Sequence, residues 1–417
     1  MHKKQTLKNG IRLITAPLKE TQTASLLVLV KVGSRQETNP VFGISHFVEH
    51  MMFKGTKKRP TTLDLSKELD GIGAEYNAYT GKDVTGYYIK SDSRHLSLAI
   101  DMLSDMLLNS KFDADELQKE KGVIVEEINM YEDNPMMFIE EMLEKMVFSS
   151  SQLSHSIAGS RQTVKAVTQE SILKYKNNFY NGSNLVIALA GKFTDEHLKE
   201  IKAKFGIKKG RKSAIEKSVT VQKAPKVKIK YKDSEQAQLA LGFQSFSKYD
   251  KRNYALQLLG VILGGNMSSR LFINIREKNG LCYFIRSWNN LYEDRGATII
   301  QAGLDKGRME FAIKAIKDEV DKIKSGVTEE ELKRAKEFIA GKMALDLEDS
   351  MAIAQYWGGL ELMNKPLIEP KEKLKKIMAV KASEIKAVAE EVFNWRQVSL
   401  AIIGPFKDEA RFKKYLK

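Results

Sequence analysis

Residues 43–56 read GISHFVEHMMFKGT, and this segment carries the most informative pattern in the chain. A helix here turns by about 100° per residue and gathers one apolar face for the core, made of Ile44, Phe47, Val48 and Met51. The opposite face carries His46, Glu49 and His50. Two imidazoles one helical turn apart lie roughly 6 Å from each other at Cβ, so both can reach one metal ion. Glu49 lies between them, where it can hold a water molecule beside the metal.

The spacing H-x-x-E-H is itself informative. It is the inverted form of a zinc-peptidase signature, in which two histidines bind the metal and the glutamate acts as the general base. The chain contains only six histidines, so a chance occurrence of this pattern is improbable. We therefore predict a zinc site on His46 and His50, with Glu49 as the catalytic base.

A second helical stretch, residues 117–131, offers a third ligand. A helical wheel places two carboxylates, Glu120 and Glu127, in one stripe with apolar side chains, whereas Glu126 points away. A carboxylate in an apolar stripe is costly unless it is paired or bound to a cation. Catalytic zinc sites with two histidines commonly take a carboxylate as the third protein ligand. The wheel alone leaves an alternative open, which is a ladder of ion pairs on the helix surface.

The rest of the chain reads as a mixture of strands and helices. An Asn-Gly turn between alternating residues predicts a hairpin at 3–15. Further strands are predicted at 24–32, 86–89 and 184–191. Helices are predicted at 44–53, at 95–108 and from about residue 113 onward. The Lys-rich stretch 206–224 has little apolar periodicity and predicts a linker between two domains.

The second half of the chain resembles a diverged copy of the first, shifted by about 215 residues. FDADELQKEK (112–121) corresponds to VTEEELKRAK (327–336). At the same shift His46 falls on Val261, His50 on Gly265 and Glu127 on Lys342. We therefore expect one half to carry the metal ligands and the other half to have lost them.

Composition and charge exclude several classes of protein. The chain has 417 residues, of which 42% are hydrophobic, so it is globular and long enough for two or three domains. Its single cysteine excludes an internal disulfide framework and suits a reducing compartment. No run approaches the roughly 18 apolar residues of a membrane span, and no apolar leader precedes the first strand. We therefore expect a cytoplasmic protein with no membrane partner.

The net charge of +15 raises the question of a nucleic-acid partner. The lysines are spread along helical stretches among many acidic residues, and no aromatic residues are interleaved with the basic cluster at 208–232. Such a distribution is typical of a solvated surface and a linker. We expect no nucleic-acid partner, although a basic nucleic-acid-binding protein stays an alternative.

Three segments together resemble one family of enzymes. HFVEHMMFKGT (46–56), EKGVIVEEINMYEDNP (120–135) and SSRLFINIREKNGLCY (268–283) resemble, in this order, the pitrilysin/insulinase family of zinc peptidases. This family includes the mitochondrial processing peptidase, and the resemblance extends over essentially the whole chain. The chain looks like the short, single-half bacterial type that is similar to the beta subunit of the processing peptidase.

The resemblance implies an α+β fold of two structurally similar domains, each a mainly antiparallel β-sheet packed with helices. The domains it implies are a catalytic zinc-binding domain at 1–206, a basic linker at 207–225 and a homologous domain without zinc at 226–417. It also implies one Zn²⁺ per chain, held by His46, His50 and Glu127. Glu120 corresponds to a further glutamate that the family needs for activity.

The resemblance also implies how a substrate binds. EYNAYTGKDVTGYY (75–88) resembles the edge strand that pairs with the substrate backbone, which places Asn77 and Ala78 beside the scissile bond. An added strand is recognised through its main chain, so varied sequences are tolerated. Arg276 and Tyr283 match a pair that contacts substrate near the zinc. The alternatives are a charged surface run for Arg276 and a core position for Tyr283.

Family enzymes enclose peptides between two halves, and this chain corresponds to one half. We therefore expect a homodimer, or a heterodimer with a homologous subunit, in which Arg276 and Tyr283 of one subunit face the zinc of the other. The predicted activity is that of a zinc metalloendopeptidase acting on peptides or on unfolded, presequence-like segments. A non-catalytic structural or partner subunit of the same fold is the main alternative.

Overall fold

The computed structural model describes residues 2–149, 151–215 and 222–416, and these residues form two compact units. The first unit contains the described parts of Met1–Asn129, His155–Glu216 and Met343–Glu369. The second unit contains the described parts of Met130–Ser154, Lys217–Lys342 and Pro370–Lys417. Within the predicted linker, residues 216–221 lie outside the described part of the chain.

A six-stranded sheet in the order β1-β2-β6-β3-β5-β4 forms the centre of the first unit. Its strands are β1 (Lys3–Thr6), β2 (Arg12–Pro17), β3 (Thr23–Val30), β4 (Glu75–Thr80), β5 (Thr85–Asp92) and β6 (Leu185–Gly191). Neighbouring strands are antiparallel except for the parallel pair β2 and β6. The central strands β3 and β6 are buried along almost their whole length, which explains their continuous apolar sequences.

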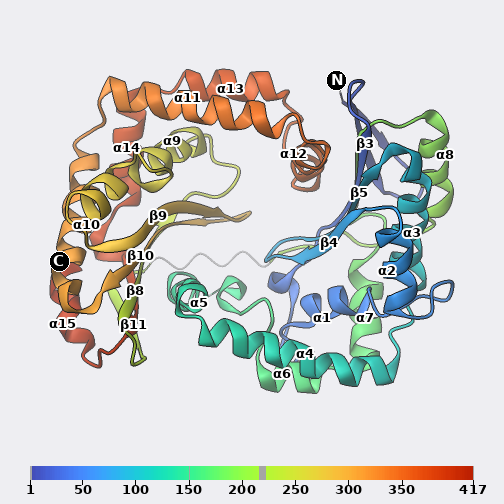
Figure 1. Cartoon of the computed structure of the whole chain (residues 1–417), viewed down its shortest axis with the longest axis horizontal. Helices are drawn as coiled ribbons and strands as arrows, with labels where there is room; N and C mark the ends of the chain where they lie inside the picture. The colour runs from blue at the N-terminus through green and yellow to red at the C-terminus, as the bar shows by residue number, and fades with distance from the viewer. Residues whose placement is uncertain (1, 150, 216–221, 417) are drawn as a thin grey trace. The chain divides into compact units, whose positions relative to one another are not determined.

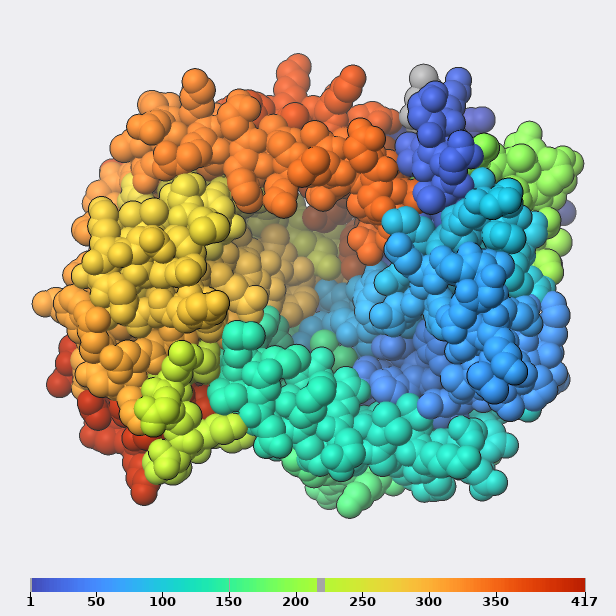
Figure 2. Space-filling model, in the orientation of Figure 1, coloured from blue at the N-terminus to red at the C-terminus, as the bar shows by residue number. Residues whose placement is uncertain are grey.

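Helices cover both faces of this first sheet. The helices that lie wholly or mostly in this unit are α1 (Ile44–Met51), α2 (Thr62–Asp70), α3 (Leu96–Asn109), α4 (Ala114–Asp133), α6 (Arg161–Ala166), α7 (Gln169–Phe179), α8 (Asp195–Lys204) and α12 (Ser350–Leu362). Side chains of α1, α3 and α7 pack on one face, and α12 packs on the other against Leu27 and Leu29 of β3. Figure 1 shows β3 and β5 between α12 and the pair α3 and α8. In the space-filling view, side chains of α2 and α3 form part of the near surface of the first unit (Figure 2).

The second unit is built on a five-stranded sheet in the order β7-β11-β8-β10-β9. Its strands are β7 (Lys226–Tyr231), β8 (Gln236–Ser245), β9 (Cys282–Leu291), β10 (Gly296–Asp305) and β11 (Ser399–Gly404). The helices that lie wholly or mostly in this unit are α5 (Pro135–Val147), α9 (Asn253–Gly264), α10 (Met309–Lys324), α11 (Glu329–Asp346), α13 (Pro370–Met378), α14 (Ala382–Val392) and α15 (Glu409–Lys413). One face of the sheet packs on α9, α10 and α14, and the other packs on α5.

The two sheets share one topology. Strands β2, β6, β3, β5 and β4 of the first sheet follow one another as β7, β11, β8, β10 and β9 do in the second. In each sheet the first of these pairs is parallel and the others are antiparallel. The long helices α4 and α11 occupy the positions that the sequence repeat predicts. The structure therefore confirms the predicted α+β fold with two similar sheet-and-helix domains.

Each unit takes one helix from the other half of the sequence. Helix α5 follows α4 in the first half of the chain, and it packs on β8 and β11 of the second unit. Helix α12 follows α11 in the second half, and it packs on β2, β3 and β6 of the first unit. The compact units are therefore not continuous in sequence. Among the described residues, every helix is too short or too polar to cross a membrane.

Candidate metal centre

Helix α1 carries the two histidines, and buried contacts fix its N-terminus. Gly43, the residue before the helix, has a φ of +96°, and a side chain there would meet the carbonyl oxygen of Ala158 at 2.5 Å. Only glycine fits this position without strain. The buried Glu37 carboxylate accepts hydrogen bonds from the backbone N–H groups of Gly43 (2.6 Å) and Ser45 (2.8 Å). These bonds satisfy donors that the start of a helix otherwise leaves unpaired.

Helix α4 brings the third candidate ligand to the same place. Glu127 Oε2 lies 3.6 Å from His46 Nε2 and 3.5 Å from His50 Nε2. The two Nε2 atoms are 3.2 Å apart. A tetrahedral zinc ion that binds nitrogen or oxygen at its usual distance holds its ligand atoms about 3.3 Å apart, so these three atoms fit one ion.

This cluster is distinctive and remains partly open to solvent. In the described part of the chain it is the one group of at least three His, Cys, Asp or Glu side chains whose ligand atoms lie within 4.8 Å of one another. The side chains of His46, His50 and Glu127 are 11%, 20% and 24% exposed. Three protein ligands with access to solvent are the arrangement of a catalytic zinc site, which keeps one position for water or substrate.

Glu120 orients the second histidine. His50 Nδ1 lies 2.8 Å from Glu120 Oε1, so a proton on Nδ1 leaves the lone pair of Nε2 available for a metal. The other carboxylate oxygen of Glu120 accepts a hydrogen bond from Lys54 Nζ at 2.6 Å. Burial by itself raises the pKa of Glu120, but the hydrogen bonds with His50 and Lys54 outweigh burial and lower that pKa. Glu120 is therefore a buried, ionised carboxylate.

The electrostatics of the ligands favour a bound cation. Burial by itself lowers the pKa of His50, but hydrogen bonds with Glu120 and Glu127 outweigh burial and raise that pKa to about 9. Burial and the neighbouring His50 lower the pKa of His46 to about 4. The hydrogen bond with His50 lowers the pKa of Glu127. Two ionised carboxylates thus attract positive charge to this place, either a proton on His50 or a metal ion.

Glu49 lies beside the cluster without belonging to it. Its Oε2 atom accepts a hydrogen bond from Thr80 Oγ1 at 2.6 Å. Burial raises the pKa of Glu49, and the Thr80 hydrogen bond opposes that rise. A carboxylate with a raised pKa is suited to taking up and releasing a proton near neutral pH.

Sequence reasoning missed three residues around this centre: Glu37, Lys54 and Thr80. Lys54 follows His50 by four positions, and that spacing was a usable signal. The roles of Glu37 and Thr80 depend on how segments distant in the sequence pack around α1. No local pattern marks them.

The predicted substrate-binding strand is the edge strand β4. It pairs with β5 and is the last strand of its sheet, and it packs beside α1. Asn77 is exposed and Ala78 is half-buried, as expected for alternating faces of an edge strand. The unpaired side of such a strand can accept another strand.

Arg276 and Tyr283 lie close together in the second unit. Arg276 belongs to a short π-helix, η4 (Phe272–Glu277), and its guanidinium carbon lies 5.6 Å from the centre of the Tyr283 ring. This distance is within the range of a cation–π contact. Tyr283 is 77% exposed, so the alternative that it is a core residue is wrong.

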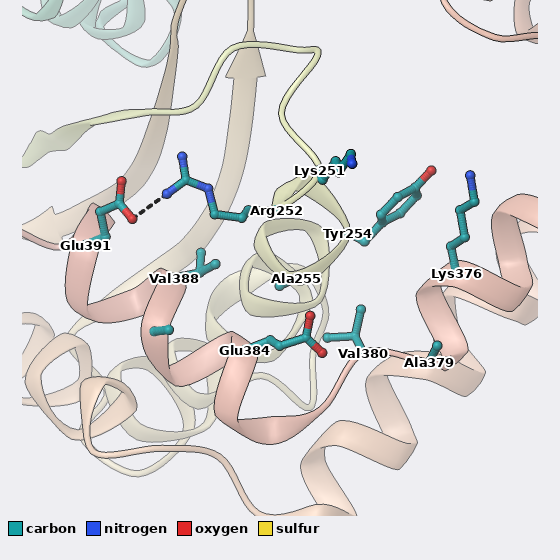
Figure 3. Close-up of a pocket in the computed structure, with 11 residues that line it drawn as sticks. Lys251, Arg252, Tyr254, Ala255, Lys376, Ala379, Val380, Glu384, Val388 and Glu391 are labelled. Atoms are coloured by element: carbon teal, nitrogen blue, oxygen red, sulfur yellow. Dashed lines mark hydrogen bonds and ion pairs between the residues drawn. The ribbon is translucent and has the colours of Figure 1, made fainter.

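The second unit also contains a pocket that is unrelated to the metal cluster. It has a volume of about 250 Å³ and lies between α9, α14 and the end of α13 (Figure 3). Its apolar wall includes Ala255, Val380 and Val388, and at its rim Arg252 forms an ion pair with Glu391. Its lining residues all belong to the second unit, whereas the three candidate ligands belong to the first. We assign this pocket no part in the chemistry.

Solved structures establish the fold independently. A protease from Helicobacter pylori is 24% identical, with a TM-score of 0.90 over 97% of this chain and 99% of that one. A structure from Pseudomonas fluorescens, described as a peptidase M16 inactive domain, is 20% identical, with a TM-score of 0.91 over 98% of this chain and 99% of that one. At these identities the likeness concerns the fold alone.

Sequence comparisons identify the family of the chain as well as its fold. Residues 12–161 match insulinase (peptidase family M16), and residues 166–339 match the peptidase M16 inactive domain. An uncharacterized zinc protease of Bacillus subtilis is 34% identical over 97% of this chain and 98% of its own length. Another from Streptomyces coelicolor is 33% identical over 98% of this chain and 90% of its own length. On these matches, which extend through both halves, the chain belongs to the insulinase family of zinc proteases, peptidase family M16.

Proposed function

We propose that this chain is a zinc metalloendopeptidase that hydrolyses bonds within peptides and within unfolded or presequence-like segments. The convergence of His46, His50 and Glu127 within 4.8 Å is the observation that supports this function most directly. Glu49 lies on the same helix as the two histidines, and its pKa is raised by burial. These two observations support a metal site and a general base at one place.

In this proposal, each residue of the site in the first unit has a separate role in the reaction. When bound, zinc lowers the pKa of a coordinated water toward about 7 and polarises a carbonyl oxygen. His46, His50 and Glu127 would hold the ion, and Glu120, which contacts His50 Nδ1, would leave His50 Nε2 free to bind it. Glu49 takes the proton of the attacking water and later passes it to the leaving amine.

Substrate recognition in this proposal is mainly through the peptide backbone. A peptide that adds to the unpaired side of β4 lies beside Asn77 and Ala78, next to the helix that carries Glu49. Main-chain hydrogen bonds of this kind place few demands on side chains. The enzyme therefore accepts many unfolded sequences and requires them to be extended.

We further propose one zinc per chain and a dimeric enzyme. The exposure of Tyr283 supports a role at a partner subunit's site, where its hydroxyl stabilises the oxyanion that develops during hydrolysis and Arg276 holds the substrate. A second copy of this chain, or a homologous subunit, is the proposed partner. The single cysteine supports a reducing compartment, and we propose the cytoplasm.

The decisive experiment incubates the purified chain with a mixture of unfolded peptides and identifies the products by mass spectrometry. We expect internal cleavage that a chelator abolishes and added zinc restores. Glu127→Gln should lose both bound zinc and cleavage. Glu126→Gln is the matched control, because Glu126 is the exposed neighbour on the same helix, and it should behave as wild type. Stoichiometric zinc without any cleavage would contradict the proposal and favour a structural subunit.

A further inference from the structure

The hydroxyl group of Thr80 contacts the carboxylate that we assign as the catalytic base. Thr80 Oγ1 donates a hydrogen bond to Glu49 Oε2 over 2.6 Å, and both side chains are half-buried. Thr80 is the last residue of β4, whereas Glu49 lies on α1. This hydrogen bond therefore joins the edge strand to the metal-binding helix. It occupies one carboxylate oxygen of Glu49 and leaves the other available for a different partner.

The backbone around Thr80 is fixed on both sides. Thr80 pairs with Thr85 across the hairpin between β4 and β5, and Gly81 N–H donates to the carbonyl of Val84 at 2.7 Å. The carbonyl of Gly81 also accepts a hydrogen bond from Ser34 N–H at 3.1 Å. These pairings fix the backbone from which the Thr80 side chain projects.

The segment at residues 33–37 holds the hairpin and the helix together. Its N–H groups at Ser34 and Arg35 donate to the carbonyls of Gly81 and Lys82. Three residues after Ser34, the Glu37 carboxylate accepts the two N–H groups at the start of α1. One buried segment thus sets the position of the Thr80 hydroxyl relative to Glu49. The hydrogen bond is a consequence of this frame rather than of a chance surface encounter.

We propose that Thr80 is a positioning residue that holds the Glu49 carboxylate in one rotamer for proton transfer. The proposal rests on the proposed peptidase function and adds to it a residue that the ligand set does not include. Because Thr80 ends the strand that we propose to bind substrate, the same residue connects the bound peptide to the base. A general base must lie within hydrogen-bond reach of its proton, so a misplaced carboxylate slows the chemical step without weakening substrate binding.

The test compares Thr80→Val, which removes the hydroxyl at nearly constant shape, with Thr80→Ser, which keeps it. We expect Thr80→Val to lower kcat by about tenfold to hundredfold while KM and bound zinc stay unchanged. Thr80→Ser, which keeps the hydroxyl group, should retain most of the wild-type kcat. Thr6→Val, on the exposed edge strand β1, is the control for replacing a strand threonine and should retain wild-type kcat. A higher KM at constant kcat, or equal losses in Thr80→Val and Thr80→Ser, would overturn the proposal.

A second readout does not depend on activity. Crystal structures of zinc-loaded wild type and Thr80→Val should show the Glu49 carboxylate in one rotamer in the first and moved or spread over several in the second. An unchanged Glu49 rotamer in Thr80→Val would contradict the positioning role. A wild-type chain that cleaves no peptide would contradict the proposed function alone, because the rotamer comparison would still decide the role of Thr80.

Discussion

Glu49 is the residue whose replacement should separate catalysis from metal binding. We expect Glu49→Gln to abolish peptide cleavage, because an amide cannot take the proton of the attacking water. Bound zinc should stay near one ion per chain, since Glu49 does not belong to the converging ligand set. Elemental analysis and peptide cleavage on the same sample check both statements. Cleavage by Glu49→Gln at the wild-type rate would show that another group is the base.

Glu120 should affect zinc affinity without being a ligand. It holds His50 Nδ1 at 2.8 Å, and loss of such an outer partner typically weakens metal binding by about tenfold to a hundredfold. We expect that loss in Glu120→Gln, measured by competition with a chromophoric chelator. Glu116→Gln, on the same helix and paired with Lys119 near the surface, is the control and should retain wild-type affinity. Equal affinities for Glu120→Gln and wild type would contradict the assigned role.

At the scale of single elements, helix α1 depends on a buried acid at its N-terminus. Burial raises the pKa of Glu37 to about 8, although hydrogen bonds from Ser45 and Gly43 and the charge of Lys82 oppose the rise. The ordinary value is 4.5, so the folded chain binds the Glu37 proton more tightly than the unfolded chain does. The stabilising contribution is therefore complete below pH 4.5 and is lost as pH rises toward 8.

Glu37→Gln should remove this pH dependence. We expect the unfolding free energy of wild type, relative to Glu37→Gln, to fall between pH 5 and pH 8 by at most about 1.4 kcal/mol per pH unit. Urea denaturation of both proteins with zinc removed gives the comparison, and titrations common to both proteins cancel. Parallel stability curves for the two proteins across this range would show that Glu37 has no raised pKa.

Most helices and strands could be predicted from the sequence, but the sheet on which each helix packs could not. The hairpin at the N-terminus, the short helix α1 and the long helix α4 follow from the Asn-Gly turn and from apolar periodicity. The exchange of α5 and α12 between the halves was not predictable. An amphipathic pattern shows that a helix has an apolar face to bury and carries no information about which sheet receives it.

The same limit applies to the candidate site. Local spacing was enough to predict His46, Glu49 and His50, because all three lie on one helix. To predict Glu127 as a ligand, both the apolar stripe of α4 and the family resemblance were needed. Thr80 meets Glu49 only through the register of β4 beside α1, which is a tertiary property.

At the scale of the whole molecule, two units of one topology carry different sets of functional candidates. Both sheets have the same topology, but the converging ligand set lies in the first unit. The second unit instead presents an exposed tyrosine, Tyr283, beside Arg276. These two different sets of residues are the basis of our proposal that two subunits share one site. Closed symmetric dimers are the commonest assemblies of soluble proteins.

Mixing two inactive variants tests whether that site is shared. Glu49→Gln lacks the base, and Tyr283→Phe lacks the hydroxyl that we place at the partner's zinc. If the site is shared, a mixed dimer has one intact site, because the base of one chain meets the tyrosine of the other. Random exchange of subunits should then restore about a quarter of wild-type activity. If each chain completes its own site, the mixture stays as inactive as its parts, and sedimentation showing a fully active monomer would exclude a shared site directly.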